Sequence, residues 1–174
     1  MKSLAVSIIL LVVFIAPGIS QSPDYPSDFL DSEFHQERRN LVREKMPANS
    51  VSAFFANPVR NRANDVDYVY HQDPNFYYLT GYKEPNAVLL IFKGMQTNES
   101  GESYNEIIFV QPRNEMYEMW TGRREGPDGV KENLAIAQAF NNTDFAGYSV
   151  DLTKFDKILF YDFQNDIRDS QRDE

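Results

Sequence analysis

Two unbroken apolar runs of strand length dominate the hydrophobic pattern of this chain. They are residues 87–92 (A-V-L-L-I-F) and 107–110 (I-I-F-V). A strand with one solvent-facing side alternates apolar and polar residues, so an unbroken run predicts a central strand covered on both faces. A polar turn rich in Gly, Asn and Ser, residues 93–105, separates the runs. We therefore expect the strand at 106–110 to return antiparallel to the first.

The aromatic-rich stretch 62–82 changes its pattern twice. Its first part alternates apolar and polar residues, which predicts a strand with one apolar face formed by Val66, Tyr68 and Tyr70. Asp73 then suits the N-cap of a short helix and Pro74 its first position. Gly81 predicts the end of that helix, because glycine adopts the left-handed cap conformation at little cost.

A helix is predicted to begin after Asp31 or Ser32 and to end before Pro47. Glu33 near its start and basic residues near its end complement the helix dipole. The residue before a proline is disfavoured in the α region, which sets the end. The predicted buried stripe consists of Phe34, Leu41, Val42 and Met46.

Weaker patterns predict a strand at 50–56, a polar loop at 57–64, a short helix or loop at 115–120, helical pieces at 127–131, 134–140 and 151–155, and a last strand at 158–161. Strands covered on both faces and separated by helices predict a three-layer α/β domain with a mixed β-sheet. Both hairpin-like and crossover connections occur, so a purely doubly wound sheet is not expected.

The two ends of the chain differ from this globular pattern. Residues 1–20 are expected to be a secretory signal peptide, because Lys2 precedes an apolar run that ends at a Pro-Gly pair and small residues. An uncleaved membrane anchor is the alternative, but the run is short for the ~20 residues that span a bilayer. Residues 21–31 form an extended leader, 32–165 one domain, and 166–174 a charged tail or the start of a linker. The protein is thus expected to be secreted or periplasmic.

The net negative charge of the chain limits the kinds of binding partner that can be expected. The chain of 174 residues carries 17 basic and 26 acidic side chains, a net charge of −9, and cleavage of residues 1–20 would remove only Lys2 and leave −10. Such a chain repels nucleic acid and anionic membranes, so neither is expected as a partner after signal cleavage. The acidic residues are spread toward both ends, which is typical of solvated surface and tails.

Catalytic motifs are not found. The chain has no cysteine and only two histidines, His35 and His71. It contains no H-E-x-x-H zinc motif, no G-x-S-x-G nucleophile elbow and no phosphate-binding glycine loop. His71 at a strand end is interpreted as a hydrogen-bonded residue, not as a ligand.

Three segments in order resemble one family. They are R-x-x-D-x-D-Y with H-Q-D and F-Y-Y-L-T-G-Y-x-E-P-x-A (residues 62–87), F-V-Q-P-R (109–113) and W-T-G-R-R-x-G-P (120–127). Together they are similar to the N-terminal domain of Xaa-Pro aminopeptidases, the aminopeptidase P branch of the creatinase and prolidase superfamily. The resemblance covers about residues 33–165. One departure is His71, where the family has an arginine, so an ion pair made by that arginine is not expected in this chain.

The resemblance implies a ribonuclease H-like layout for this domain and a second, C-terminal pita-bread domain that carries the catalysis. In the family that domain binds two divalent ions, typically manganese, through two aspartates, a histidine and two glutamates, and cleaves the bond before proline. No catalytic or metal-binding residue can be transferred to this chain. It needs no cofactor of its own, and alone it is expected to be inactive.

What the resemblance does transfer is a supporting role. In the family this domain packs on the catalytic domain, forms part of the active-site entrance and contributes to oligomer contacts. The candidate interface residues are Tyr77, Tyr78, Trp120, Arg123 and Arg124. The alternatives are that one of the two tyrosines packs in the domain's own core and that Trp120 fastens its loop to the sheet.

Two hypotheses for function remain. The first is the non-catalytic N-terminal domain of a secreted or periplasmic Xaa-Pro aminopeptidase, whose partner is its own catalytic domain and whose full-length form acts on proline-containing peptides. The second is a free-standing, non-catalytic module that binds a catalytic partner or another protein. An enzyme in its own right is a third and less favoured hypothesis.

Overall fold

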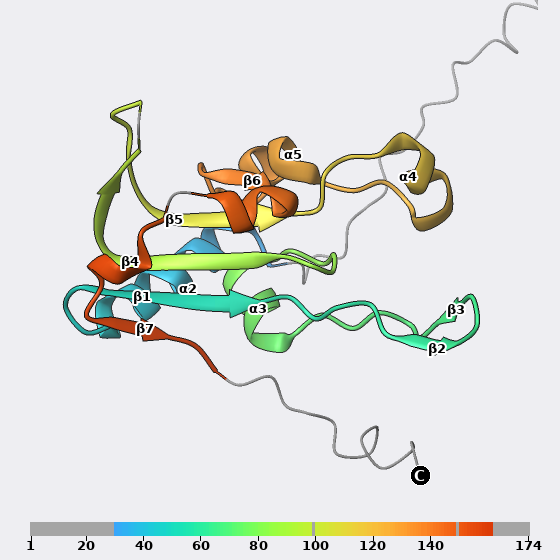
Figure 1. Ribbon diagram of the computed structural model, residues 1–174, viewed down its shortest axis with the longest axis horizontal. Coiled ribbons are helices and arrows are strands. Elements are labelled where there is room, and N and C mark those ends of the chain that lie inside the picture. The colour runs from blue at the N-terminus through green and yellow to red at the C-terminus, as the bar shows by residue number, and fades with distance from the viewer. Residues whose placement is uncertain (1–29, 99, 149, 162–174) are drawn as a thin grey trace, which may run out of the picture.

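The computed structural model describes residues 30–98, 100–148 and 150–161 (Figure 1). The expected signal peptide, most of the leader and the charged tail lie outside the described residues and stay predictions. Within the described ranges, no helix is long and apolar enough to cross a membrane.

A five-stranded mixed sheet forms the centre of the molecule, with strand order β6-β5-β4-β1-β7. Its strands are β1 (Ser50–Phe55), β4 (Val88–Thr97), β5 (Ser103–Val110), β6 (Ala139–Asn141) and β7 (Lys157–Leu159). The central strands β1, β4 and β5 pair antiparallel, whereas the edge strands β6 and β7 pair parallel to β5 and β1. The predicted antiparallel return and mixed sheet are confirmed.

Helices cover the two faces of this sheet unequally. The helical elements are α2 (Ser32–Lys45), α3 (Pro74–Thr80), α4 (Glu115–Thr121), α5 (Gly126–Asn133) and the short 3-10 helices η1 (Asn142–Gly147) and η2 (Leu152–Lys154). Helices α2, α3 and α5 pack against one face, and the chain around η1 and η2 packs against the other. The predicted three-layer α/β fold is confirmed, with a thin third layer.

The apolar runs supply both cores, as their pattern predicts. Leu89 and Ile91 of β4 face the three helices, whereas Leu90 and Phe92 face the opposite side. All four are buried. Since successive side chains of a strand point to opposite faces, an unbroken run is the pattern that a doubly covered strand requires.

Helix α3 follows its predicted signals closely. The Asp73 carboxylate accepts a hydrogen bond from the backbone N–H of Phe76 at 2.8 Å, and Pro74 occupies the first turn. Gly81 ends the helix with φ of 72°. A Cβ there would lie 2.8 Å from Nε2 of His35, so the close contact between α3 and α2 also requires glycine.

The buried stripe of α2 differs from the prediction. Met46 is buried, but Leu41 is exposed, and the fully buried positions of the helix are His35 and Arg39. The Arg39 guanidinium donates to carbonyl oxygens of Leu79 and Ala135 and to the Glu106 carboxylate. Hydrophobic patterning misses such positions, because a satisfied polar side chain can occupy the core.

The predicted helical piece at 134–140 is wrong. Helix α5 ends at Asn133, and Ala135 has φ of 54°, which turns the chain away from the helix. The following residues extend into β6, where Ala139 pairs with Ile108. Burial of Ile136 and Ala139 in the helix-side core is achieved by an extended chain, so tertiary packing outweighs local helix propensity.

Candidate docking surface

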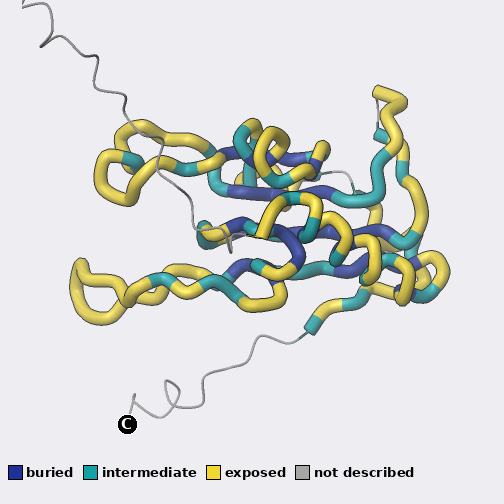
Figure 2. The backbone as a smooth tube through the Cα atoms, turned by 180° about the vertical axis from the view of Figure 1, so that it is seen from behind, coloured by how far each residue is buried: buried dark blue, intermediate teal, exposed yellow. Residues whose placement is uncertain are grey.

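Two arms project beyond the same end of the sheet along the long axis of the molecule (Figure 1). The hairpin arm, residues 57–70, carries β2 (Asn61–Ala63) and β3 (Val66–Asp67), which pair with each other. The α4 arm, residues 112–125, carries α4. Figure 2 shows both arms exposed over most of their length. Of the strand predicted from Val66, Tyr68 and Tyr70, only Val66–Asp67 is a strand, and it pairs with β2 in this hairpin. Val66 and Tyr68 are exposed there, so the predicted buried apolar face is wrong.

Both arms present large apolar side chains to solvent. On the hairpin arm these are Val59, Val66, Tyr68 and Val69, and on the α4 arm they are Met116, Tyr117, Met119 and Trp120. Trp120 is 86% exposed, Val69 81% and Met119 77%. We call these eight residues the two-arm surface. Apolar groups gathered on projections of a small domain mark a binding surface more often than chance exposure.

Gln72 fastens the base of the hairpin arm. Its side-chain oxygen accepts hydrogen bonds from the backbone N–H groups of Asn57 and Asp73, at 3.2 and 2.8 Å, and from the Tyr70 hydroxyl at 2.9 Å. Its amide nitrogen donates to the carbonyl oxygens of Tyr82 and Glu84. One side chain thus joins both ends of the arm to the segment that follows α3.

Tyr70 closes the same base from the arm itself. Its one hydroxyl proton is shared between Gln72 Oε1 and the carbonyl oxygen of Asn57, which lies 3.1 Å from the hydroxyl oxygen. Burial, together with the nearby Asp73 carboxylate, raises the pKa of Tyr70 to about 12. The phenol therefore stays protonated and keeps its donor role at any physiological pH.

Glu84 fastens the α4 arm. One carboxylate oxygen accepts the backbone N–H of Glu125 at 2.7 Å, and the other accepts the Tyr82 hydroxyl at 2.8 Å. Burial first, and the Glu84 carboxylate second, raise the pKa of Tyr82 well above its ordinary value. Because Gln72 donates to the Glu84 carbonyl, the bases of both arms meet at Glu84.

Within the α4 arm, local bonds shape the helix. Asn114 caps α4 by accepting the N–H groups of Met116 and Tyr117. Arg113 pairs with Glu118 through two bonds of 2.6 and 2.8 Å, and these bonds hold the pKa of the Glu118 carboxyl below its usual range. The aliphatic part of the Arg113 side chain packs closely against Gly126. A Cβ added to residue 126 would lie 2.7 Å from Cγ of Arg113.

Three of the predicted interface residues lie together on the α4 arm. Trp120 extends into solvent, so it does not fasten the loop to the sheet. Arg123 is exposed beside it. The Arg124 guanidinium lies over the Tyr117 ring, 5.9 Å from its centroid, in a cation–π arrangement.

The other two predicted residues belong to α3 and pack toward α2. The Tyr77 ring meets the buried His35 edge-on at 5.7 Å, and it is only partly exposed. The Tyr78 ring meets Phe34 at 5.6 Å and is 47% exposed. These contacts agree with the alternative that one tyrosine supports the domain's own packing.

Most of the two-arm surface was not predicted from the sequence. The alternation of Val66 and Tyr68 predicted a half-buried strand, although the Asn- and Asp-rich residues around it are a turn signal. Met116 and Met119 carried no recognisable motif. The only sequence feature that indicated loops is the frequency of glycine, asparagine and arginine in and next to the two arms.

His71, the departure from the family pattern, lies at the base of the hairpin arm. Its side chain is exposed, and its backbone carbonyl accepts a hydrogen bond from Asn57 at 3.0 Å. No ion pair of its ring is found within the described residues. Gln72 and Asp73, its neighbours in the motif, carry the structural bonds instead.

The residues described by the structure contain no cluster of His, Cys, Asp and Glu that could hold a metal ion. His35 is buried, and its Nδ1 donates to the carbonyl oxygen of Tyr78 at 2.9 Å. That bond orients the ring between α2 and α3.

Comparison with known proteins gives a consistent result. Residues 35–160 match the family model described as aminopeptidase P, N-terminal domain. An Xaa-Pro aminopeptidase of Haemophilus influenzae is 38% identical over 117 residues, which cover 67% of this chain and 26% of the relative. Intermediate cleaving peptidase 55 of Schizosaccharomyces pombe is 33% identical over 135 residues, covering 78% of this chain and 27% of the relative.

Solved structures agree with the sequence relatives. Pseudomonas aeruginosa aminopeptidase PepP superposes with a TM-score of 0.70 and 28% identity, over 81% of this chain and 31% of that chain. Escherichia coli aminopeptidase P with the inhibitor Pro-Leu gives a TM-score of 0.66 and 27% identity over the same shares. The chain therefore spans about a quarter to a third of the length of the proteins that it matches.

Proposed function

Because the chain belongs to the family of the aminopeptidase P N-terminal domain, we propose that it is the non-catalytic N-terminal domain of a secreted or periplasmic Xaa-Pro aminopeptidase. Its role is to dock on a catalytic domain that corresponds to the remaining length of the relatives. The full-length enzyme releases the N-terminal residue that precedes proline.

The two-arm surface is the observation that carries this proposal. Trp120 and Met119 are 86% and 77% exposed on the α4 arm, while the bases of both arms are fixed by the bonds of Gln72 and Glu84. Docking surfaces usually carry exposed aromatic and methionine side chains on a rigid support. Such a surface loses little conformational entropy when it binds.

The hydrolytic chemistry is assigned to the partner domain. Two manganese ions bound there would activate water and polarise the peptide carbonyl. This chain's residues contribute binding: the aromatic and arginine side chains of the α4 arm offer stacking and charge to a neighbouring domain or to the peptide that approaches it.

The reading frame after Glu174 tests the proposal most directly. We expect it to encode a domain with two aspartates, a histidine and two glutamates as metal ligands. A stop codon followed by unrelated sequence would contradict the proposal and favour a free-standing module, for which the same two-arm surface would serve a partner in trans.

A second test uses the chain itself. The purified chain, assayed on an Xaa-Pro dipeptide with added Mn²⁺, is expected to show no turnover, whereas the Escherichia coli enzyme serves as the positive control. Hydrolysis that persists through repeated purification would overturn the assignment of a non-catalytic role.

The single tryptophan provides a third test. Trp120 is the only tryptophan, so its fluorescence reports the α4 arm alone. Its emission is expected to shift to the blue when the chain is joined to the catalytic domain encoded after Glu174. An unshifted emission in the joined protein would show that the α4 arm is not the docking surface.

A further inference from the structure

Residues 82–85, which lie between α3 and β4 in the chain, contact the bases of both arms. We call these four residues the junction. At the base of the hairpin arm, the side-chain nitrogen of Gln72 donates to the carbonyl oxygens of Tyr82 and Glu84, at 3.2 and 2.8 Å. The side-chain oxygen of Gln72 accepts backbone N–H groups near both ends of that arm. Gln72 therefore holds the hairpin arm with its oxygen and the junction with its nitrogen.

The α4 arm is attached to the same junction at both of its ends. Just before the arm, the side-chain nitrogen of Gln111 donates to the carbonyl oxygen of Pro85 at 3.1 Å. At the end of the arm, the backbone N–H of Glu125 donates to the Glu84 carboxylate at 2.7 Å. Because Glu84 and Pro85 are neighbours in the chain, a movement of the junction displaces both ends of the α4 arm together.

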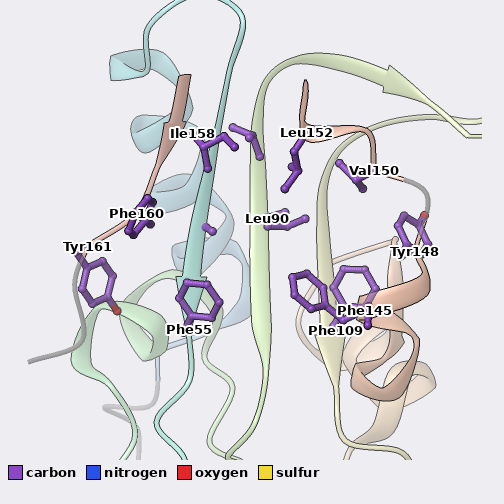
Figure 3. Close-up of a pocket in the computed structure, with 13 residues that line it drawn as sticks. Phe55, Leu90, Phe109, Phe145, Tyr148, Val150, Leu152, Ile158, Phe160 and Tyr161 are labelled. Carbon is purple, nitrogen blue, oxygen red and sulfur yellow. The ribbon is translucent and has the colours of Figure 1, made fainter. Parts of the chain in front are cut away.

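The side-chain oxygen of Gln72 has a fixed support. The backbone N–H of Asp73 donates to it at 2.8 Å, and Asp73 caps α3. The Asp73 carboxylate also accepts the Tyr161 hydroxyl at 2.8 Å. Tyr161 lines an apolar groove of about 600 Å³ on the sheet face opposite α2, where its ring lies beside Phe160 (Figure 3). One end of Gln72 is thus anchored to α3 and to the chain after β7, so its other end can position the junction.

Within the junction, Glu84 connects Gln72 to the α4 arm. Its carbonyl oxygen accepts the bond from Gln72, whereas its carboxylate accepts the Glu125 N–H and, at 2.8 Å, the Tyr82 hydroxyl. Tyr82 is buried, and its ring meets Phe76 edge-on at 6.3 Å. A buried hydroxyl that loses its acceptor destabilises the fold, so Tyr82 holds the Glu84 carboxylate in one orientation.

These contacts bring together the three sequence segments that carry the family resemblance. Gln72, Glu84 and Pro85 belong to the first segment, Gln111 belongs to the second, and Glu125 lies within the third. The segments are far apart in the chain, but their polar groups bond to each other at one place. The motif residues therefore share a structural role that is separate from any contact with a partner.

We infer that Gln72 is a positioning residue for the α4 arm and acts through Glu84, so that both arms change their mobility together. Gln72 fixes the Glu84 backbone, and the Glu84 carboxylate fixes the end of the α4 arm. A partner that orders one arm thereby orders the other, because both arms depend on the same bonds. This consequence for docking rests on the proposed function, whereas the coupling of the arms is a property of this chain and is measured without a partner.

The variant Gln72→Glu separates the two halves of this side chain. A carboxylate keeps the acceptor oxygen for the hairpin arm, but it has no N–H to donate to the junction. In the purified chain near neutral pH, we expect the backbone amides of residues 112–125 to exchange with deuterium about fivefold faster than in the unsubstituted chain. Amides of β4 should stay unchanged. Hydrogen–deuterium exchange with mass spectrometry measures both segments in one experiment.

Asn57→Ala is the matched control. It removes the bond from the Asn57 side chain to the His71 carbonyl oxygen at the same base, but it leaves Gln72 and the junction intact. Exchange of residues 112–125 should therefore match the unsubstituted chain. Unchanged exchange in Gln72→Glu, or equal acceleration in both variants, would overturn the inference. Acceleration of β4 to the same extent as the arm would also overturn it, because it would show a global loss of stability.

A double-mutant cycle tests whether Gln72 acts through Glu84. Glu84→Ala removes the carboxylate that holds the α4 arm, so Gln72→Glu in that background should add less than about twofold to the exchange of residues 112–125. Full multiplication of the two effects would contradict action through Glu84. Since no catalytic domain takes part in these measurements, failure of the coupling and failure of the docking proposal are distinguishable.

Discussion

At the residue scale, the largest departure from hydrophobic patterning is the buried charge of α2. Arg39 has no exposed surface, and its guanidinium bonds to two backbone carbonyls and to Glu106, which Arg43 also contacts at 2.7 Å. Those bonds connect α2 to β5, to α3 and to the segment after α5. A buried ion pair adds little net stability, but loss of one partner is costly because the other charge stays buried.

The variant Arg39→Met tests this cost while it preserves most of the side-chain volume. It removes the donors to Leu79, Ala135 and Glu106, and we expect it to lower the free energy of unfolding by about 3–5 kcal/mol. Urea denaturation followed by circular dichroism measures the change. As a control, Arg38→Met removes the surface pair with Glu37 and the cation–π contact with Phe34, and it should cost about 1 kcal/mol. Equal losses for the two variants would contradict a special role of Arg39.

Gln72 is the second residue whose contribution to stability can be measured, and its neighbour His71 provides the matched control. Gln72→Leu leaves the Asn57 and Asp73 N–H groups and two carbonyls without their partner, at about 1–3 kcal/mol for each group that water does not reach. We expect His71→Ala to stay within about 0.5 kcal/mol, because that side chain is exposed. Chemical denaturation of both variants decides whether the motif serves structure through Gln72 or through His71.

At the scale of elements, capping residues predicted helix ends correctly. Longer periodic patterns of apolar and polar residues did not predict the type of element correctly. The Asp73-Pro74 start and the Gly81 stop of α3 are as predicted, because they depend on the local backbone alone. The 134–140 segment and the alternation at 65–71 depend on what packs against them. One lies in the core as an extended chain, and the other projects into solvent as a hairpin.

The α4 arm offers a prediction at this scale. Glu84→Ala removes the carboxylate that holds the Glu125 N–H and the Tyr82 hydroxyl, so residues 112–125 should exchange amide hydrogens at least tenfold faster. Hydrogen–deuterium exchange with mass spectrometry measures this, and β4 should remain protected. Glu132→Ala, an exposed residue of α5, serves as the control. Unchanged exchange in the α4 arm would show that Arg113 and Glu118 suffice to hold it.

At the scale of the whole molecule, three tyrosines connect the sheet edge, α3 and the two arms. Burial is the main cause that raises the pKa values of Tyr70, Tyr82 and Tyr161, and the pKa of Tyr70 rises to about 12. A nearby carboxylate, of Asp73 or of Glu84, raises each pKa further. Their shared property is a hydroxyl that donates into the structure near a carboxylate. Together they make the fold sensitive to strong base.

The sign of that dependence follows from linkage. The folded pKa values lie above those of the unfolded chain, so these tyrosines contribute stability in full below pH about 10, where both states keep their protons. For Tyr70 that stability is lost as pH rises from about 10 through 12, and for Tyr82 and Tyr161, whose pKa values are raised further, the loss also begins above pH 10. Urea denaturation at pH 8 to 11.5 should show the free energy of unfolding falling above pH 10.

A variant isolates the contribution of one phenol. Tyr70→Phe lowers stability at neutral pH through its lost hydroxyl bonds, but its decline above pH 10 should be shallower than that of the unsubstituted chain. An identical slope in both proteins would show that Tyr70 does not contribute to the alkaline transition. The comparison of slopes keeps this result independent of the loss at neutral pH.

The sequence by itself determined the central strands, the caps of α2 and α3 and the family, because unbroken apolar runs, proline, glycine and ordered motifs act through local geometry and chain order. Tertiary structure decided that Arg39 is buried, that residues 57–70 project, and that Gln72 and Glu84 join the bases of both arms. It also left one sheet face with an open apolar groove. The physical reason is that burial and polar satisfaction depend on neighbours far away in the chain, which no local pattern of apolar and polar residues encodes.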